Sequence, residues 1–402
     1  MRTLALPLAA LLLAGTAFAQ QAEPQPDPEA TRDKPELRGF SIVKKPGANQ
    51  GQPAPALAAP QAGAAPAPSP PRLTRPDFEP GGSVRVPQFE LPPSPFLSPQ
   101  ALAAQKARSR NPAVPPSFDA PIAPARAEIE TRLAPLVARM RAVYPVAIEQ
   151  QIMGGVSTRI VTPLGKATDR RRVLINLHGG SFSLCADACG LLESIPLAGL
   201  GAMKVVAVNY RMAPEARHPA ALEDVTAVYR ELLKSYKPRQ IGIFGCSAGG
   251  ALTAQTGAWL PSKGLPQAGA LGVFGGGGVP FMMGDSAWTA ANIDGYFPEP
   301  DRMRGDFARG YFTGADQADA VISPALHPAV MAKFPPTMLI TGTRAFDLSP
   351  AVVTNSALLK AGVRSTLIVG EGMGHCYIMY PDLPEARDAH QAMVNFFREN
   401  LK

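Results

Sequence analysis

A serine between small residues is the first group in this sequence that could perform covalent chemistry. Residues 245–250 read Gly-Cys-Ser-Ala-Gly-Gly, so Ser247 lies at the centre of a Gly-x-Ser-x-Gly motif. The apolar run 241–244 precedes the motif, and a helical pattern follows it. In this strand–turn–helix setting the motif forms a nucleophile elbow, whose tight turn needs small neighbours and exposes the serine hydroxyl. The motif therefore predicts that Ser247 attacks an acyl carbon.

Acyl transfer also needs N–H donors where the carbonyl oxygen becomes negative. Residues 178–182 read His-Gly-Gly-Ser-Phe and directly follow the apolar run 173–177. Glycines let the backbone approach a reacting oxygen closely, and one such donor typically contributes about 3 kcal/mol of transition-state stabilisation. We expect the oxyanion hole to consist of the N–H groups of Gly179, Gly180 and Ala248.

A serine hydroxyl is a weak nucleophile and needs a general base beside it. His375, one of five histidines, lies in a glycine-containing loop just after the apolar run 366–369. His178 belongs to the glycine-rich stretch and is expected to be structural. The remaining histidines lie in helical or proline-flanked segments: His218, His327 and His390. We therefore predict that His375 is the base.

The base in turn needs a carboxylate that fixes its tautomer and stabilises its positive charge. Asp347 is the only acid in the loop after the apolar run 338–341, so it could reach His375 from a separate strand. Glu371 and Asp382 are alternatives, but both lie close to His375 in sequence. Asp347 could also cap the helix that follows it. The chain order serine, aspartate, histidine is the one that nucleophile-elbow folds use, which favours Asp347.

The elements that must position these groups alternate between short apolar runs and helical patterns. The runs predict buried strands at 173–177, 205–208, 241–244, 271–274, 338–341 and 366–369. Helices are predicted at 221–236, 248–258, 351–361 and 385–401. This alternation is typical of an α/β fold, a mostly parallel sheet with helices on both faces. The loops beyond the carboxyl ends of the strands, where ligands bind in such sheets, contain all the candidate residues.

The first 125 residues have a different composition. Residues 1–19 begin with Arg2, continue with an apolar stretch and end in Ala-Phe-Ala, which is typical of a signal peptide. The mature chain is expected to be exported to the periplasm or secreted, with no stable membrane insertion after cleavage. Residues 20–125 are rich in Pro and Ala and are expected to be a disordered tail or linker. The folded domain is predicted to be 126–402, with a first amphipathic helix that ends before Pro145.

Four cysteines would then meet an oxidising compartment: Cys185, Cys189, Cys246 and Cys376. They allow three pairings, and sequence alone does not choose among them. Cys185 and Cys189 are close enough for a local bridge, although four residues within a regular helix is an awkward spacing. Four small buried thiols are the other interpretation. The spacing does not suggest a metal site.

A net charge of +7 and a pI near 9.3 raise the question of nucleic-acid binding. No run of five or six basic residues occurs, and the densest cluster is residues 170–172, just before an apolar strand. That pattern favours an ordinary solvated loop, so no nucleic-acid partner is expected. The oligomeric state cannot be read from the sequence.

From about residue 160 to the end, the chain resembles the hormone-sensitive-lipase-like branch of the α/β-hydrolases. Residues 178–182 correspond to its His-Gly-Gly-Gly-Phe motif, with Ser181 in place of a glycine. Residues 245–250 correspond to Gly-Asp-Ser-Ala-Gly-Gly, with Cys246 in place of the aspartate. Residues 210–224 match a long stretch of that branch, including Tyr-Arg-x-Ala-Pro-Glu. Around Asp347 the chain reads Asp-Leu-Ser-Pro, where the branch has Asp-Pro-Leu-x-x-Asp.

The resemblance implies a carboxylesterase that acts on short- to medium-chain acyl esters, with a helical cap at about 126–145 and 281–312. The leading hypothesis is an exported serine esterase that works through an acyl-serine intermediate and needs no metal or organic cofactor. Its partner is a small ester substrate. Alternatives are a deacetylase of polysaccharide or amide substrates, an inactive ligand-binding protein on a hydrolase scaffold, and an envelope-interaction protein that works through its proline-rich tail.

Overall fold

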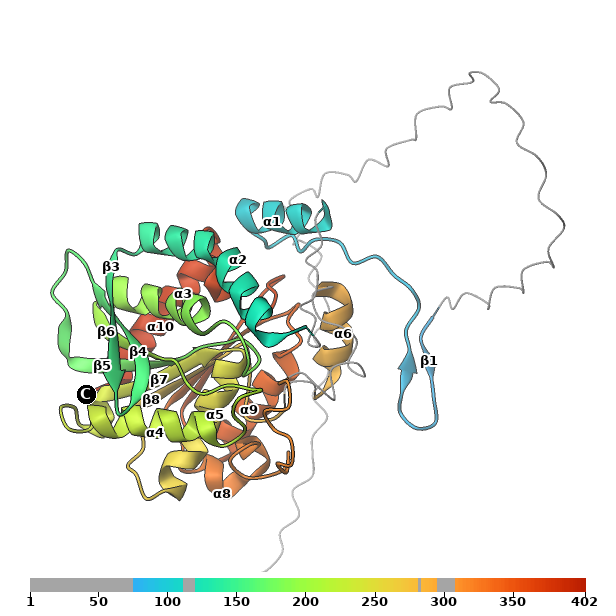
Figure 1. Ribbon diagram of the computed structural model, residues 1–402. Coiled ribbons are helices and arrows are strands. Elements are labelled where there is room, and N and C mark those ends of the chain that lie inside the picture. The colour runs from blue at the N-terminus through green and yellow to red at the C-terminus, as the bar shows by residue number, and fades with distance from the viewer. Residues whose placement is uncertain (1–74, 111–119, 281–282, 295–307) are drawn as a thin grey trace, which may run out of the picture. The chain divides into compact units, whose positions relative to one another are not determined.

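A mixed eight-stranded sheet lies at the centre of the fold (Figure 1). The structure is a computed structural model that describes residues 75–110, 120–280, 283–294 and 308–402. The strand order is β10-β9-β8-β7-β5-β6-β4-β3. These strands are β3 (Val146–Met153), β4 (Val156–Pro163), β5 (Asp169–Leu177), β6 (Met203–Val208), β7 (Ile241–Cys246), β8 (Ala270–Phe274), β9 (Thr337–Gly342) and β10 (Ser365–Gly370). A separate two-stranded hairpin consists of β1 (Asp77–Phe78) and β2 (Val84–Arg85).

Six neighbouring strands of the sheet are parallel, and they are the six predicted from the apolar runs. The predicted α/β fold is therefore confirmed. The other two strands, β3 and β4, pair antiparallel with each other, and β4 is antiparallel to β6. This hairpin has no continuous apolar run in the sequence, because much of β3 is exposed and polar, and it was not predicted.

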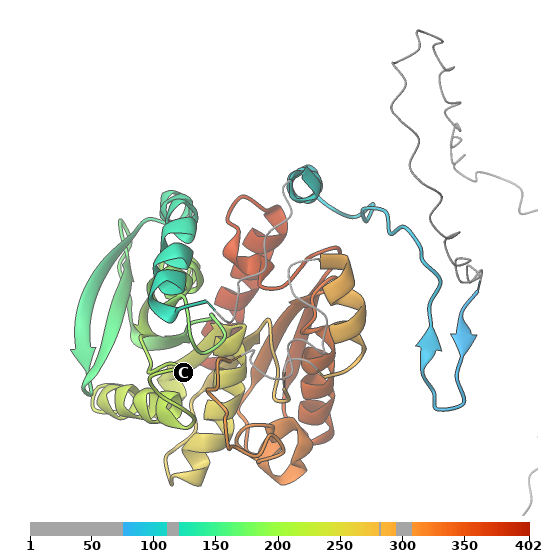
Figure 2. The ribbon, with the colours of Figure 1, turned by 45° about the vertical axis from the view of Figure 1, so that its right-hand side comes forward.

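Helices cover both faces of the sheet (Figures 1 and 2). They are α1 (Pro99–Arg110), α2 (Ile122–Val143), α3 (Ala186–Gly199), α4 (Ala220–Leu232), α5 (Ala248–Ser262), α6 (Asp285–Asp294), α8 (Pro328–Met331), α9 (Leu348–Lys360) and α10 (Pro384–Asn400). Short 3-10 turns are Pro238–Gln240, Pro324–Leu326 and Tyr377–Met379. Within the described ranges, no helix combines the length and the apolar character needed to cross a membrane.

Alternation along the strands divides the core into two layers. Val173 and Ile175 of β5 pack with apolar residues of α4, α5 and α9, whereas Leu174 packs with residues of α2, α3 and α10. Successive side chains of a strand point to opposite faces, so a strand covered on both sides must be apolar throughout. This requirement explains why the buried parallel strands could be recognised as continuous apolar runs.

The structure departs from the predicted linker at 20–125. Helix α1 forms within it, and α2 begins at Ile122 rather than at residue 126. Ser98 donates its backbone N–H and its hydroxyl to Glu385 of α10, at 2.8 and 3.0 Å, and Gln105 Nε2 donates to the Gly372 carbonyl at 2.9 Å. Polar contacts with distant residues stabilise this segment, and its low apolar content hid them from sequence analysis.

The structure describes only part of the residues for which an N-terminal segment and a cap were predicted. The signal peptide at 1–19 and the tail to residue 74 lie outside the described residues. Of the predicted cap at 126–145 and 281–312, residues 281–282 and 295–307 also lie outside. The described parts of the cap are α2, α6 and the turn that precedes Phe312.

The four cysteines form two disulfides, Cys185–Cys189 and Cys246–Cys376. Cys185 is the N-cap of α3 and has a φ of 65°, so the local bridge spans the helix start rather than a regular turn. Its Cα–Cα distance of 5.3 Å is within the usual range for disulfides. The second bridge joins the end of β7 to the loop after β10. The pairing thus resolves the alternatives that the sequence left open.

Candidate active site

Ser247 lies in a sharp turn between β7 and α5. Its φ of 60° and ψ of −126° are unusual for a residue with a side chain, and its N–H donates to the Phe274 carbonyl at 3.0 Å. A Cβ atom at Gly245 would lie 2.0 Å from the Leu177 carbonyl oxygen, and one at Gly249 would lie 1.7 Å from the same atom. The backbone of β5 therefore excludes a side chain at positions 245 and 249, two residues before and two residues after the serine. The glycines of the motif are a packing requirement of the elbow.

His375 and Asp347 are brought together from two different loops. His375 Nδ1 lies 2.6 Å from Asp347 Oδ1, and Asp347 is fully buried. Its other oxygen accepts a hydrogen bond from Thr341 Oγ1 at 2.6 Å. Asp347 is the N-cap residue of α9 but makes no side-chain capping hydrogen bond, which removes the capping interpretation. The arrangement favours the imidazole tautomer with its proton on Nδ1, which leaves Nε2 as the basic nitrogen.

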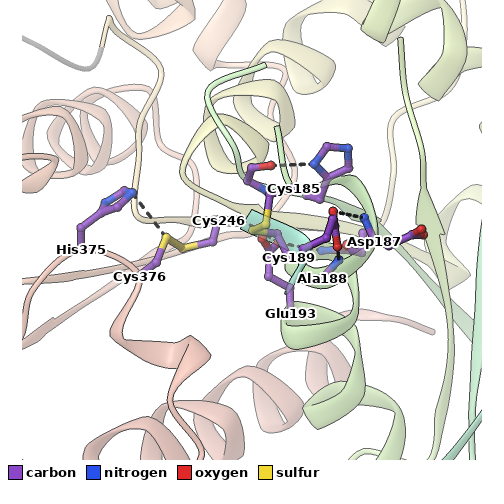
Figure 3. Close-up of a disulfide and its surroundings, with 12 residues drawn as sticks. Cys185, Asp187, Ala188, Cys189, Glu193, Cys246, His375 and Cys376 are labelled. Atoms are coloured by element: carbon purple, nitrogen blue, oxygen red, sulfur yellow. Dashed lines mark hydrogen bonds between the residues drawn. A yellow bond between two sulfur atoms is a disulfide. The ribbon is translucent and has the colours of Figure 1, made fainter. Parts of the chain in front are cut away.

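A disulfide links the loop of His375 to the elbow that contains Ser247. His375 Nε2 lies 3.6 Å from Cys376 Sγ, and Cys376 is bonded to Cys246, the residue before Ser247 (Figure 3). The ring of Phe346 packs against the imidazole, with 4.5 Å between centroids. The structure thus joins Asp347 and His375 by a hydrogen bond, and connects His375 to the elbow through the disulfide. Catalytic hydrogen bonds commonly tighten only when substrate is bound.

The glycine-rich loop lies against the elbow. A Cβ atom at Gly179 would be 3.3 Å from the Cβ of Ser247. The Gly179 N–H, predicted as an oxyanion donor, instead donates to Glu193 Oε1 at 2.9 Å. Within the described part of the chain, the N–H groups of Gly180 and Ala248 donate to no protein acceptor. Of the three predicted donors, Gly180 and Ala248 therefore keep an N–H group that could bind an oxyanion.

His178 supports the glycine-rich loop from inside the protein. It is buried, its Nδ1 lies 2.6 Å from the Gly179 carbonyl, and its ring stacks on Tyr210 with 4.1 Å between centroids. The Tyr210 hydroxyl donates to the His178 carbonyl at 2.7 Å. Burial lowers the pKa of His178 to about 4, so its ring is neutral at pH 7. The structural role expected for His178 agrees with these contacts.

Glu193 is the site residue that sequence analysis missed. This carboxylate is buried in α3 and accepts hydrogen bonds from the N–H groups of Gly179 and Cys246 and from the Asn176 amide, at 2.9, 3.0 and 2.8 Å. It therefore holds the glycine-rich loop and the elbow at a fixed separation. Burial raises the pKa of Glu193 to about 8, although the three donors oppose that shift. The available signal was an acid within the mostly apolar stretch 191–198.

Replacing Glu193 with glutamine is expected to change the pH dependence of stability. The pKa of Glu193 is about 8 in the folded protein against an ordinary value of 4.5, so the folded state binds more protons between these values. The free energy of unfolding of the wild type therefore falls as the pH rises through this window, by up to about 1.4 kcal/mol per pH unit from this group. Relative to the wild type, the variant should become more stable from pH 5 to pH 8.

Urea unfolding at pH 5, 6.5 and 8 measures this difference. The matched control is Glu149→Gln, at an exposed position. The free energy of unfolding of this control should differ from that of the wild type by nearly the same amount at all three pH values. The substitution also removes a hydrogen-bond acceptor from buried N–H donors, which lowers the free energy of unfolding by a similar amount at each pH. If the free energies of unfolding of Glu193→Gln and the wild type differ by the same amount at all three pH values, the pH effect assigned to Glu193 is contradicted.

Comparison with known proteins places this arrangement in context. A family described as having the alpha/beta hydrolase fold matches residues 174–379. An acetyl-hydrolase of Streptomyces hygroscopicus is 30% identical over 229 residues, which cover 56% of this chain and 75% of that protein. The crystal structure of an esterase superposes with a TM-score of 0.69 at 28% identity, and covers 80% of this chain and 99% of that one. An esterase from the bacterial hormone-sensitive lipase family gives 0.65 at 25% identity, with coverages of 76% and 99%.

Proposed function

Because this chain belongs to the α/β-hydrolase family, in its hormone-sensitive-lipase-like branch, and is a carboxylic ester hydrolase, we propose that it cleaves short- to medium-chain acyl esters through an acyl-serine intermediate on Ser247. The observation that carries the proposal is the 2.6 Å contact between His375 Nδ1 and buried Asp347, in loops at the same sheet edge as the elbow. The resemblance to an acetyl-hydrolase supports a short acyl group.

In the proposed reaction, His375 Nε2 takes the proton of the Ser247 hydroxyl while Oγ bonds to the ester carbonyl carbon. Asp347 accepts the Nδ1–H bond and stabilises the imidazolium that forms. The alcohol then leaves with the proton from His375, and a water molecule, activated by the same base, releases the acid. Release of the acid restores the Ser247 hydroxyl and the neutral His375 imidazole. Side chains and backbone N–H groups supply every proton transfer and charge stabilisation in this scheme, so the proposed mechanism calls for no metal or organic cofactor.

The negative oxygen of the tetrahedral intermediate would bind to the N–H groups of Gly180 and Ala248. Ala248 is the first residue of α5, so its N–H lies at the positive end of the helix dipole. Gly179 contributes in another way, because its hydrogen bond to Glu193 fixes the loop that contains Gly180. A positive φ of 110° at Gly180, where a Cβ atom would lie 2.0 Å from the Leu184 carbonyl oxygen, explains why this position is a glycine.

Export to the periplasm or the exterior is part of the proposal. It rests on the signal-peptide pattern of residues 1–19. The two disulfides support it, because such bonds persist mainly in oxidising compartments.

Hydrolysis of p-nitrophenyl esters from acetate to palmitate tests the substrate range. We expect kcat/KM to be highest for short or medium chains and to fall towards palmitate. Each added methylene improves kcat/KM only while the protein can bury it, a gain of about 0.8 kcal/mol per group. The chain length at which kcat/KM stops rising therefore measures the acyl site.

The same series separates the alternatives. Preference for palmitate would contradict the proposed acyl range. Hydrolysis of p-nitroacetanilide at a rate above that of the acetate ester would favour an amide substrate. No turnover of any ester by folded protein would contradict the esterase proposal and favour a ligand-binding role.

A further inference from the structure

We propose that the Cys246–Cys376 disulfide is a positioning element of the active site, which holds the loop of His375 against the nucleophile elbow. The inference rests on the proposed function, because it assigns His375 as the base for Ser247. It also assigns a role to Cys246, which lies where the hormone-sensitive-lipase-like motif has an aspartate.

The two half-cystines are the immediate neighbours of the reacting residues. Cys246 is the last residue of β7 and precedes Ser247, and Cys376 follows His375. The bridge joins positions 130 residues apart and brings their Cα atoms to 6.2 Å. With one peptide step of 3.80 Å at each end, the Cα atoms of Ser247 and His375 cannot be more than about 14 Å apart while the bond is intact.

The disulfide and the imidazole also share one packing surface. Gly275 follows β8, and a Cβ atom there would lie 2.7 Å from Cys376 Sγ, 2.8 Å from Cys246 Sγ and 3.2 Å from His375 Cε1. His375 Nε2 is 3.6 Å from Cys376 Sγ (Figure 3). The bridge is therefore in contact with the ring that it would position, and both depend on the absence of a side chain at 275.

Hydrogen bonds anchor the loop before His375. The Gly372 N–H donates to Thr343 Oγ1 at 2.7 Å, and the Met373 carbonyl accepts from the Arg344 N–H at 3.0 Å. Beyond these residues the loop turns through Cys376, whose φ is 49°. The disulfide holds this second part of the loop to the elbow, whose Cys246 N–H is in turn bound by Glu193.

The second disulfide provides a matched control. Cys185 and Cys189 are four residues apart at the start of α3, and they pack with apolar residues of α2. Neither is adjacent in sequence to Ser247, His375 or Asp347. Removing this bridge also deletes one covalent link and two sulfur atoms, but leaves the connection between the elbow and the histidine loop.

The test compares Cys246→Ser/Cys376→Ser with Cys185→Ser/Cys189→Ser in the purified full chain. Both variants are assayed with p-nitrophenyl acetate well below their thermal unfolding midpoints, after circular dichroism has shown that they are folded. We expect kcat of the first variant to fall on the order of 10²-fold, because small misplacement of a catalytic group has an effect of that size. KM should stay within about 3-fold, since substrate binding is not altered. The control should keep its wild-type kcat.

Sulfonylation of Ser247 by phenylmethylsulfonyl fluoride, followed by intact mass, gives a readout that does not need ester turnover. Its rate depends on activation of the serine by His375, so it should fall in the first variant and not in the control. If the serine pair does not fold, Cys246→Ala/Cys376→Ala keeps the buried site apolar. Failure of both pairs to fold would show a requirement for folding itself and overturn the positioning role.

The outcomes separate this inference from the proposed function. A wild-type kcat and sulfonylation rate in the first variant would overturn the inference while the esterase proposal stands. Slower sulfonylation in that variant alone, with no ester hydrolysed by the wild type, would support the positioning role and contradict the proposed substrates. A wild type that neither hydrolyses esters nor reacts at Ser247 would overturn both.

Discussion

Replacing Ser247 with alanine is expected to lower kcat for p-nitrophenyl acetate by on the order of 10⁴- to 10⁶-fold. The substitution removes the only atom that forms the covalent acyl intermediate, so the remaining rate comes from the oxyanion donors and substrate binding. The helix after the elbow and the neighbouring glycines are unchanged, and alanine fits wherever serine does. KM and the thermal unfolding midpoint should therefore change little.

Ser262 provides the control, because this exposed serine is the last residue of α5, the same helix that follows Ser247. Its alanine variant should keep the wild-type kcat. Intact mass after treatment with phenylmethylsulfonyl fluoride should show one adduct in the wild type and none in Ser247→Ala. Retention of more than about a tenth of the wild-type kcat would contradict the nucleophile assignment, because a lost nucleophile costs orders of magnitude more.

Replacing Asp347 with asparagine is expected to lower kcat by about 10³- to 10⁴-fold. The amide has nearly the shape of the carboxylate, but it removes the negative charge that stabilises the imidazolium. It can also present an N–H to His375 Nδ1, which would place the ring proton on Nε2 and block its role as a base. Thr341 Oγ1, which donates to Asp347 Oδ2 at 2.6 Å, limits how the amide can turn.

The other acids near His375 in sequence are the controls for this variant. Asp382 is exposed and forms an ion pair with Arg139 at 3.0 Å, and Glu371 is exposed. Asp382→Asn and Glu371→Gln should each leave kcat within about 2-fold of the wild type, since surface charges contribute little. A larger loss of kcat in either control than in Asp347→Asn would identify a different orienting acid.

The amino-acid sequence by itself determined the six parallel strands and the candidate residues that follow them. Buried parallel strands must be apolar on both faces, so β5, β6, β7, β8 and β9 each produced a continuous apolar run that could be recognised. The run at 366–369 also marks a strand, but β10 lies at the edge of the sheet and is only partly buried, so its predicted burial was wrong. The glycines around Ser247 are required because the β5 backbone lies 2.0 Å or less from the position of an added Cβ atom. Asp347 could be selected because it is the only acid in its loop, and its distance of 2.6 Å to His375 agrees with that selection.

Other features were decided by tertiary structure. The pairing of Cys246 with Cys376 depends on β7 and the loop after β10 meeting across 130 residues, and four cysteines alone allow three pairings. The role of Glu193 also depends on tertiary structure. Its carboxyl group in α3 accepts the N–H of Gly179, so this N–H does not serve as the predicted oxyanion donor. Helix α1, within the proline-rich segment, is held by polar contacts with α10 and the loop at Gly372.

The physical reason for this division is the range of the interactions. Backbone sterics, turn geometry and the alternation of side chains act between near neighbours, and they leave a pattern in the sequence that can be read directly. A disulfide or a buried carboxylate depends on which distant segments the packed sheet brings within a few ångströms of each other. Cys246, Cys376 and Glu193 are such residues, and their partners could be identified only in the folded chain.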